Sequence, residues 1–484
     1  MATSMNKTLS ICAALFLVVA LVGNVSGQNA DLKDQAMPGN NRFENGAVQA
    51  ARTKEALESV EKAIAVLIPG GIADGSPRKE KFAAVIDSFI KRQSRDAMDA
   101  LEKMAAEDPG LPPAEIMMAG LTFAVGDNKS GIALLENSAI KHPDYPGVYL
   151  SFAQLAINTN RITDASLHAE KTARLIEAGN LTPQQKSHFL KQYYEVATSI
   201  YMRRKQNDQA SKTLDQLQAI TPNLPFYFFS KAELAFRAGD NDLALRYLKQ
   251  HAGATKSKRL PELTLVDWLK NTGKSQPAEE LLLKTREQNP KNATAQMMAA
   301  QMYMSREDFP NSLLAIKQFE EINNGESPQS LDMKGRIAFA GLSYDVAAEH
   351  FRDLTIKAPN DPSNANILAL CLVESNDPQK QKEAVQISQR VASRMSNNPL
   401  AVASLAYILM KNGEKENSKQ LMQRIAMSRQ TTPEVSYFVA NWLIQNGQPD
   451  QAAGILKQTI DVKGLFLYRS AARKLLSSLQ KEKQ

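Results

Sequence analysis

The sequence predicts an all-α protein, an α-solenoid of about eleven stacked helix hairpins with a capping helix at each end. Small residues recur with a spacing of 34 residues, for example from Ala97 to Gly131 and from Gly131 to Ala165. Prolines such as Pro143 and Pro290 follow the amphipathic segments, where a helix must end. A hairpin that recurs at a fixed period can bury its second apolar face only by stacking on its neighbours.

Residues 328–361 show the repeating unit. Leu331 and Gly335 lie on one face of a first helix, and Ala347 and Phe351 lie on one face of a second. A small residue near the start of each second helix lets the two helices approach closely, and a mostly apolar residue follows four positions later. The small positions are Ala97, Gly131, Ala165, Ala210, Ala244, Ala278, Ser312, Ala347, Ala384, Ser418 and Ala452.

Residues 1–27 have the pattern of a secretory signal peptide. Lys7 precedes an apolar run at 9–22, and small residues end at Gly27. We expect cleavage after Gly27 and export to a periplasm or to the extracellular space. The apolar run is shorter than the roughly 20 residues that span a bilayer. An uncleaved anchor stays open as an alternative, and it would be the one source of membrane contact.

Between the signal peptide and the repeats, polar residues 28–42 predict a flexible leader. Residues 43–77 are expected to form an N-terminal capping helix and a loop, because Leu57, Val60 and Ile64 lie three and four residues apart. The cap would cover the apolar face that the first repeat leaves open.

The repeat array is expected at 78–464, and a C-terminal capping helix with a basic outer face at 465–484. Two spacings exceed the period clearly, a short one from Ala347 to Ala384 and a longer one from Ala165 to Ala210, which adds 11 residues to 34. The insertion is close to three turns at about 3.6 residues each, so the buried face is preserved. Thr182-Pro183 followed by Gln185 predicts a capped, lengthened first helix that ends near Arg204.

The units resemble tetratricopeptide repeats over about 78–464. The family's large-then-small pair early in the first helix is matched, and Tyr201 and Tyr303 match its later aromatic residue. Two features depart from the pattern: the family's early Trp has no counterpart, and Lys334 stands where a large apolar residue is usual. The resemblance implies a right-handed superhelix whose first helices line a concave surface. The matching pairs are Met118-Ala119, Phe152-Ala153, Ala299-Ala300, Leu368-Ala369, Leu405-Ala406 and Val439-Ala440.

The resemblance also places candidate partner-binding residues on that concave surface. The densest feature is the aromatic run at 225–229, which could supply anchors for a partner's apolar side chains. The alternative is that Tyr227 and Phe228 only pack against the neighbouring hairpin, and for Phe229 both interpretations stay open. The predicted groove residues are Phe229, Glu233, Phe236, Arg237, Asp267, Lys270, Gln301, Arg336, Tyr407, Tyr437 and Asn441.

Other classes of function find little support in the sequence. The net charge is +7, but basic and acidic residues alternate along the chain, which argues against nucleic-acid binding. The five histidines have no metal-ligand spacing. Cys371 is the only cysteine outside the signal segment and falls among leucines, which favours a buried thiol. We find no catalytic motif, and we expect no catalytic site, metal or small-molecule cofactor.

These observations predict a non-enzymatic scaffold or adaptor that binds other proteins or peptides through the concave surface. By analogy with exported members of the family, it would support the assembly of cell-envelope or secretion machinery. One alternative is a structural or carbohydrate-binding envelope protein, because the groove aromatics would also suit sugars. A second is an enzyme whose site is built on loops.

Overall fold

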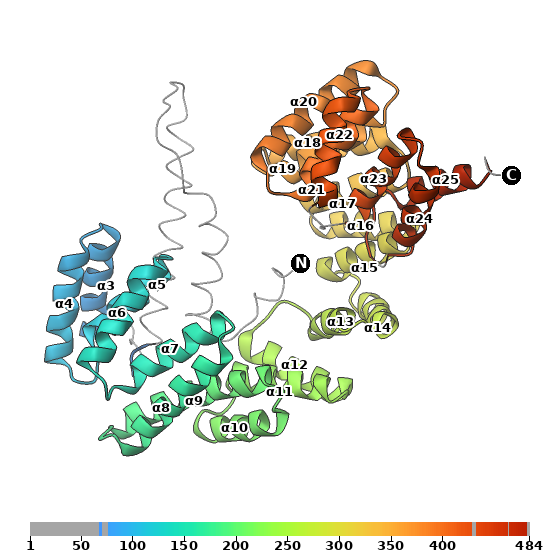
Figure 1. Cartoon of the computed structure of the whole chain (residues 1–484). Coiled ribbons are helices and arrows are strands. Elements are labelled where there is room, and N and C mark those ends of the chain that lie inside the picture. The colour runs from blue at the N-terminus through green and yellow to red at the C-terminus, as the bar shows by residue number, and fades with distance from the viewer. Residues whose placement is uncertain (1–66, 70–75, 428–431, 463, 482–484) are drawn as a thin grey trace. The chain divides into compact units, whose positions relative to one another are not determined.

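The structure is a computed structural model that describes residues 67–69, 76–427, 432–462 and 464–481. The described residues form α-helices joined by short turns, without β-strands. The predicted signal peptide and leader, and most of the N-terminal capping helix, lie outside the described residues. The chain divides into two compact units, residues 1–261 (unit 1) and 262–484 (unit 2), which are described separately (Figure 1).

Unit 1 contains five helix pairs among its described residues. A first helix packs against the second helix that follows it, as α7 does against α8. The first helices are α3 (Pro77–Ile90), α5 (Ala114–Ala124), α7 (Pro146–Asn158), α9 (Pro183–Arg203) and α11 (Pro225–Arg237). The second helices are α4 (Ser94–Glu107), α6 (Asn128–Lys141), α8 (Ile162–Ala178), α10 (Asn207–Ile220) and α12 (Asn241–Thr255).

Unit 2 contains six further pairs and one closing helix, α25 (Arg469–Lys481). The described residues therefore confirm the predicted all-α array of eleven helix pairs. The first helices are α13 (Pro261–Asn271), α15 (Ala293–Ser305), α17 (Pro328–Ala340), α19 (Pro362–Val373), α21 (Pro399–Lys411) and α23 (Pro433–Gln445). The second helices are α14 (Ser275–Gln288), α16 (Phe309–Ile322), α18 (Tyr344–Lys357), α20 (Pro378–Arg394), α22 (Lys415–Met427) and α24 (Pro449–Ile460).

The small residue near the start of each second helix is buried in all eleven pairs. In the α17–α18 pair, a β-carbon added at Gly335 would lie 2.8 Å from the ring of Phe351, which is fully buried. Two pairs carry serine at the small position. The hydroxyls of Ser312 and Ser418 each donate to a first-helix carbonyl, at 2.7 Å from Ala300 and Ala406 respectively. Close helix approach therefore explains the recurring small residue.

The lengthened first helix is also confirmed. Helix α9 runs from Pro183 to Arg203, and Thr182 and Gln185 form the predicted capping box. The Thr182 backbone NH donates to the Gln185 side chain at 3.0 Å, and the Gln185 backbone NH donates to the Thr182 hydroxyl at 3.2 Å. These two bonds satisfy backbone donors that a helix start leaves unpaired.

First helices of neighbouring pairs also contact one another, as α7 does with α9, α15 with α17, and α21 with both α19 and α23. We call the surface that these helices form in each unit its first-helix face. It is the surface on which the sequence places the partner-binding residues.

Candidate functional site

Helix α11 of unit 1 carries the densest group of aromatic residues predicted for binding. The Tyr227 ring lies edge-on to Tyr247 of α12, with ring centres 6.5 Å apart, and to Phe228 at 5.5 Å. The Lys231 ammonium lies 5.7 Å from the centre of the Tyr227 ring. Tyr227 and Phe228 are both half-buried. Tyr227 therefore packs on α12 of its own hairpin, while Tyr227 and Phe228 both keep part of their surface exposed.

Phe229 packs partly against its own hairpin. Its ring centre lies 5.2 Å from that of His251 in α12, and the ring is half-buried. The Nδ1 atom of His251 lies 3.0 Å from the Pro225 carbonyl oxygen. Burial lowers the pKa of His251 below its usual value, so the imidazole is neutral at pH 7 and suits an apolar contact. Phe229 is therefore partly covered by its own hairpin, and its role in partner binding stays a prediction.

Two predicted charged residues of α11 pair with each other. A guanidinium nitrogen of Arg237 lies 2.5 Å from a carboxylate oxygen of Glu233, and about a third of each side chain is exposed, 32% and 33%. Arg237 also donates to the Met202 carbonyl of α9 at 2.7 Å. Phe236 differs from the prediction, since it is only 9% exposed and belongs to the core. The Phe236 ring points into the core, so it has little surface with which to contact a partner.

The other predicted residues belong to unit 2. Lys270 and Gln301 are exposed, and Asp267 is half-buried. Arg336 donates from Nε to both carboxylate oxygens of Asp332, one turn earlier in α17, at 2.8 Å each. The partner-binding roles of these four residues stay predictions.

Lys334, which departs from the family pattern, is explained by its neighbours. Its ammonium lies 2.8 Å from carboxylate oxygens of both Glu320 and Glu326, and its side chain is 22% exposed. Both carboxylates raise the pKa of Lys334 although burial opposes them. An ion pair at the α16–α17 turn therefore takes the place of an apolar contact.

Tyr407 and Tyr437 require a correction, because both belong to the core and not to an open groove. They are 1% and 6% exposed. Their ring centres lie 6.0 Å apart, and Tyr407 stacks on Phe438 at 4.5 Å. Asn441 donates to the Tyr437 carbonyl at 2.9 Å. Tyr407 and Tyr437 lie on first helices as predicted, but another part of the chain covers their rings.

The cover is Tyr468, a residue that the sequence analysis did not single out. Its ring is fully buried and lies on rings from three first helices of unit 2. It stacks on Tyr437 with ring centres 4.5 Å apart, and it meets Phe339, Phe438 and Tyr407 edge-on at 4.8, 5.3 and 6.0 Å. We call residues 466–481 the C-terminal segment, and the rings that it covers the tyrosine cluster.

A carboxylate stands beside the tyrosine cluster. Glu374, at the end of α19, accepts a hydrogen bond from the Tyr407 hydroxyl at 2.6 Å, and the Lys411 ammonium lies 3.1 Å away. Burial first, and the Glu374 charge second, raise the pKa of Tyr407 and Tyr468 well above the usual value, and they raise the pKa of Tyr437 to about 12. All three hydroxyls therefore stay protonated at physiological pH.

Two arginines extend the C-terminal segment along the same face. Arg473 of α25 lies 2.5 Å from the Glu307 carboxylate, in the turn between α15 and α16, and Arg469 lies 3.7 Å from it. Arg469 also donates to the carbonyls of Val462 and Gly464. Helix α25 contacts α17 as well as α24. The predicted closing helix is present, but it also reaches across to earlier first helices of unit 2. In the sequence, the pair Tyr468-Arg469 directly after the last repeat was the feature that could have indicated this contact.

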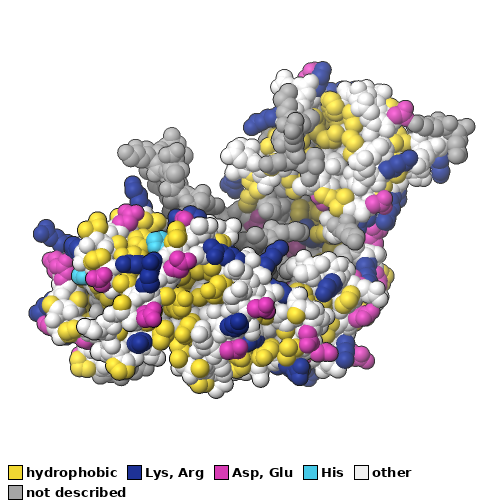
Figure 2. All heavy atoms as spheres, turned by 60° about the horizontal axis from the view of Figure 1, so that its bottom comes forward, with side chains coloured by type: hydrophobic (Ala, Val, Ile, Leu, Met, Phe, Trp, Pro, Cys, Tyr) yellow, Lys and Arg dark blue, Asp and Glu magenta, His cyan; other side chains and the backbone are white. Residues whose placement is uncertain are grey.

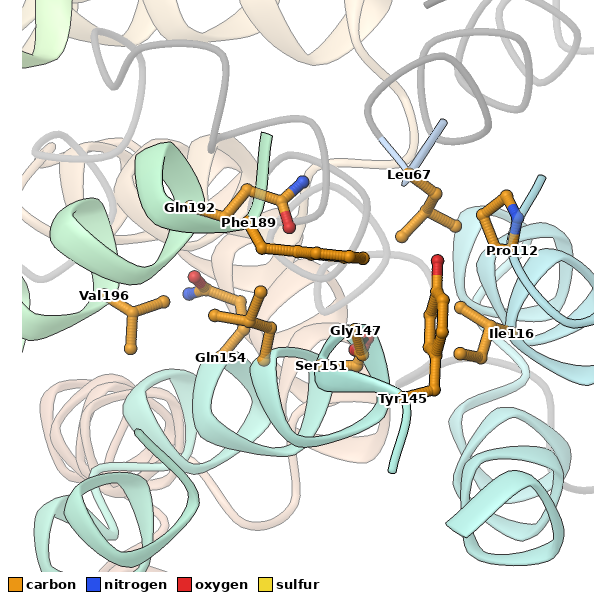
Figure 3. A pocket seen from close by; sticks show the side chains of 11 residues that line it. Leu67, Pro112, Ile116, Tyr145, Gly147, Ser151, Gln154, Phe189, Gln192 and Val196 are labelled. Carbon is orange, nitrogen blue, oxygen red and sulfur yellow. Dashed lines mark hydrogen bonds between the residues drawn. The ribbon is translucent and has the colours of Figure 1, made fainter. Parts of the chain in front are cut away.

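Unit 1 contains two hollows of different character. A small cavity of about 50 Å³ lies between α5, α7 and α9, where the rings of Tyr145 and Phe189 stand at right angles with their centres 5.4 Å apart (Figure 3). Leu67, the first described residue, closes one side of it. This volume has room for little more than a water molecule, so the cavity is part of the packing and not a ligand site.

The second hollow measures about 1100 Å³ and opens near the turns of the first two hairpins. Met98, Met118 and Leu134 contribute apolar surface, and Arg95 stands at its edge. Methionine adapts readily to differently shaped apolar partners. This hollow is a second surface of unit 1 on which another protein could lie.

Charges and metal ligands show no further site. On the visible face of each unit, basic and acidic side chains are interspersed (Figure 2). Within the described ranges, no group of three or more His, Cys, Asp and Glu side chains is placed to hold a metal ion. Among the helices that the structure describes, none is both long and apolar enough to cross a membrane. Cys371 is buried as expected, and burial raises the pKa of its thiol.

Comparisons with known proteins find similarity only among solved structures. No protein-family model matches the chain, and no curated protein matches it. A tetratricopeptide repeat protein from Parabacteroides merdae is 15% identical, over 53% of this chain and 98% of that chain, with a TM-score of 0.41. Yeast Tom70 is 13% identical, over 84% of this chain and 97% of its own, with a TM-score of 0.30.

A third solved structure, YrrB, is described as a tetratricopeptide repeat protein with an unusual peptide-binding site. It is 15% identical over 41% of this chain and 97% of its own, with a TM-score of 0.26. The chain's own geometry carries the fold assignment. Because eleven helix pairs repeat with a small buried residue at the start of each second helix, the protein is an all-α solenoid of tetratricopeptide-like units.

Proposed function

We propose that this chain is a non-enzymatic scaffold or adaptor, exported from the cytoplasm, that binds segments of other proteins on its first-helix faces. The observation that carries the proposal is the surface of α11. There the half-buried rings of Tyr227, Phe228 and Phe229 stand one to three turns from the Glu233–Arg237 ion pair. Aromatic and arginine side chains together are the usual anchors of protein interfaces.

Export rests on the sequence of residues 1–27, and a role in assembling cell-envelope or secretion machinery rests on analogy. Export predicts that the chain recovered from the envelope or medium begins at Gln28. Recovery of uncleaved chain from the membrane would favour the anchored alternative, and recovery of uncleaved chain from the cytoplasm would overturn export.

The binding surface is tested by in-cell cross-linking and capture of the tagged mature chain. Phe229→Ala combined with Arg237→Ala should lose a defined protein partner that the parent captures. The matched control is Ile140→Ala, which truncates an apolar side chain on second helix α6 of the same unit that is 80% exposed. The control should keep the partner, and circular dichroism should show that both variants remain helical.

Two outcomes would contradict the proposal. If the parent sediments with isolated wall or polysaccharide and captures no protein, the structural or carbohydrate-binding alternative takes its place. If the control loses the partner as the double variant does, the binding surface is not on α11.

A further inference from the structure

The C-terminal segment occupies the first-helix face of unit 2 in the way that a bound peptide would. Tyr468 fills the space between Phe339 of α17 and Tyr437 of α23. Arg473, one turn into α25, lies against Glu307. In helix-in-groove recognition an amphipathic helix lays its apolar face into a hydrophobic groove, and α25 follows its aromatic residue in this way.

The attachment of this segment begins at residues 466–469 and continues along α25. Phe466, Leu467, Tyr468 and Arg469 are buried. In α25, Ala472 and Leu479 are buried, and Leu475 and Leu476 are half-buried. These four apolar residues lie on one face of the helix, so the segment lays an amphipathic helix on the unit after its aromatic residue.

The connection between α24 and the C-terminal segment is loosely packed. Val462 and Leu465 are 42% and 46% exposed although both are apolar. Gly464 lies between them with φ +101°, and no atom lies within 4 Å of the position that a β-carbon would take there. The side chains of these described residues are therefore not packed against the unit, although Arg469 donates to the carbonyls of Val462 and Gly464.

The fit of the segment to the face is also incomplete. The Tyr468 hydroxyl and the Arg469 Nε are buried and find no hydrogen-bond partner among the described residues. A buried polar group that lacks a partner costs free energy. A ligand that placed equivalent anchors without burying unpaired polar groups of its own would avoid this cost and bind more tightly.

We propose that the first-helix face of unit 2 is a binding site for a helical segment of a partner protein, which displaces the C-terminal segment. The partner segment carries an aromatic residue directly before its helix, for the tyrosine cluster, and an arginine five positions later, for Glu307. The C-terminal segment is the internal occupant of the same site. This inference rests on the proposed function, because it names the ligand chemistry of one first-helix face.

The test uses the full mature chain and a fluorescent synthetic peptide with the sequence of residues 464–484. The parent should bind the peptide weakly, because its own segment competes. The variant Arg473→Glu, and the double variant Tyr468→Ala with Arg473→Glu, should bind at least tenfold more tightly. Adding Glu307→Arg to the double variant should weaken binding at least tenfold, because the peptide arginine would then meet a positive charge.

The control is a peptide that carries the same Tyr468→Ala and Arg473→Glu changes, which should bind neither the parent nor the two variants that keep Glu307. Hydrogen exchange reports the state of the face: residues 466–481 should lose protection in the open variants while α17 and α21 keep theirs. If the variants stay folded with the segment released and bind no peptide, the proposal is overturned.

Two other outcomes also overturn it. Loss of protection throughout α17 and α21 in Arg473→Glu would make the segment part of the unit's core. Concentration-dependent dimers of the parent, with the segment exchanged between copies, would make a second copy the occupant. The experiment uses a defined peptide on unit 2, so its failure leaves the α11 surface of unit 1 and the proposed function untouched.

Discussion

Arg473 pairs with Glu307 although 166 positions separate them in the chain. Most contacts in a linear repeat array join neighbouring units, whereas this pair joins the closing helix α25 to the turn between α15 and α16. Tyr468 strengthens the link, since it touches Phe339 of α17 as well as Tyr437 of α23. The last helix pair of unit 2 is therefore tied to pairs that precede it by several repeats.

This link should change how unit 2 unfolds. A free-ended array loses its terminal repeats first, but here α23 and α24 should be protected from hydrogen exchange about as well as α17. Tyr468→Ala should lower protection in α23 and α24 first. Ile356→Ala, which truncates a 72% exposed side chain of α18, is the matched control and should change nothing. Fast exchange of α23 and α24 in the parent would show that the link adds no stability.

Gly335→Ala should destabilise unit 2 although alanine is the better helix former. The gain in helix propensity is about 1 kcal/mol. The added carbon would lie 2.8 Å from the buried ring of Phe351, and overpacking of this kind costs about 1–3 kcal/mol. We expect a lower midpoint in urea unfolding.

Gly454→Ala provides the contrast for this prediction. Gly454 is an exposed residue of helix α24, and no atom lies within 4 Å of its β-carbon position. Its replacement should raise stability by about 0.5–1 kcal/mol. If both glycine variants were stabilised, close packing at Gly335 would not be the reason for the small residue.

Replacing each of two buried serines by alanine should change the stability of the protein differently. Ser312 donates a hydrogen bond to the Ala300 carbonyl at 2.7 Å, and its loss should cost about 0.5–1.5 kcal/mol. The Ser388 hydroxyl is buried and has no hydrogen-bond partner among the described residues, so Ser388→Ala should be neutral or stabilising. Urea midpoints of the two variants test the difference, and equal losses would contradict it.

Stability should fall as the pH drops below about 6.5. Burial, with the Lys191 charge, lowers the pKa of His188 from 6.5 to about 4, so between these values the unfolded chain binds more protons than the folded one. The contribution of His188 to the free energy of unfolding is therefore fully present above pH 6.5. It is lost as the pH falls toward 4, and the loss is up to roughly 3 kcal/mol. Burial lowers the pKa of His168 and His251 in the same direction.

His188→Gln should flatten this dependence between pH 6.5 and 5, where carboxylates titrate little. Denaturant midpoints of parent and variant across that range provide the measurement. The glutamine can still bond its neighbour Gln192, whose amide lies 3.1 Å from the histidine Nε2 in the parent. An unchanged slope in the variant would assign the acid sensitivity to other groups.

The sequence by itself determined the class of fold, the repeating helix pair and the lengthened helix α9. Spacing and side-chain size are local properties, and they placed Ala347 against the first helix and Thr182 at the start of α9. The same spacing assigned Tyr407 and Tyr437 to the first-helix face. It could not show whether that face is open, because periodicity describes each unit and its neighbours only.

The tertiary structure alone decided what covers the face. Tyr468 and Arg473 belong to no repeat, and their partners Phe339 and Glu307 lie more than a hundred residues earlier in the chain. A contact of this kind depends on how several helix pairs accumulate in space, and no local pattern encodes it. For the same reason the sequence indicated a partner-binding surface at Tyr407, where folding had already buried the ring under the chain's own end.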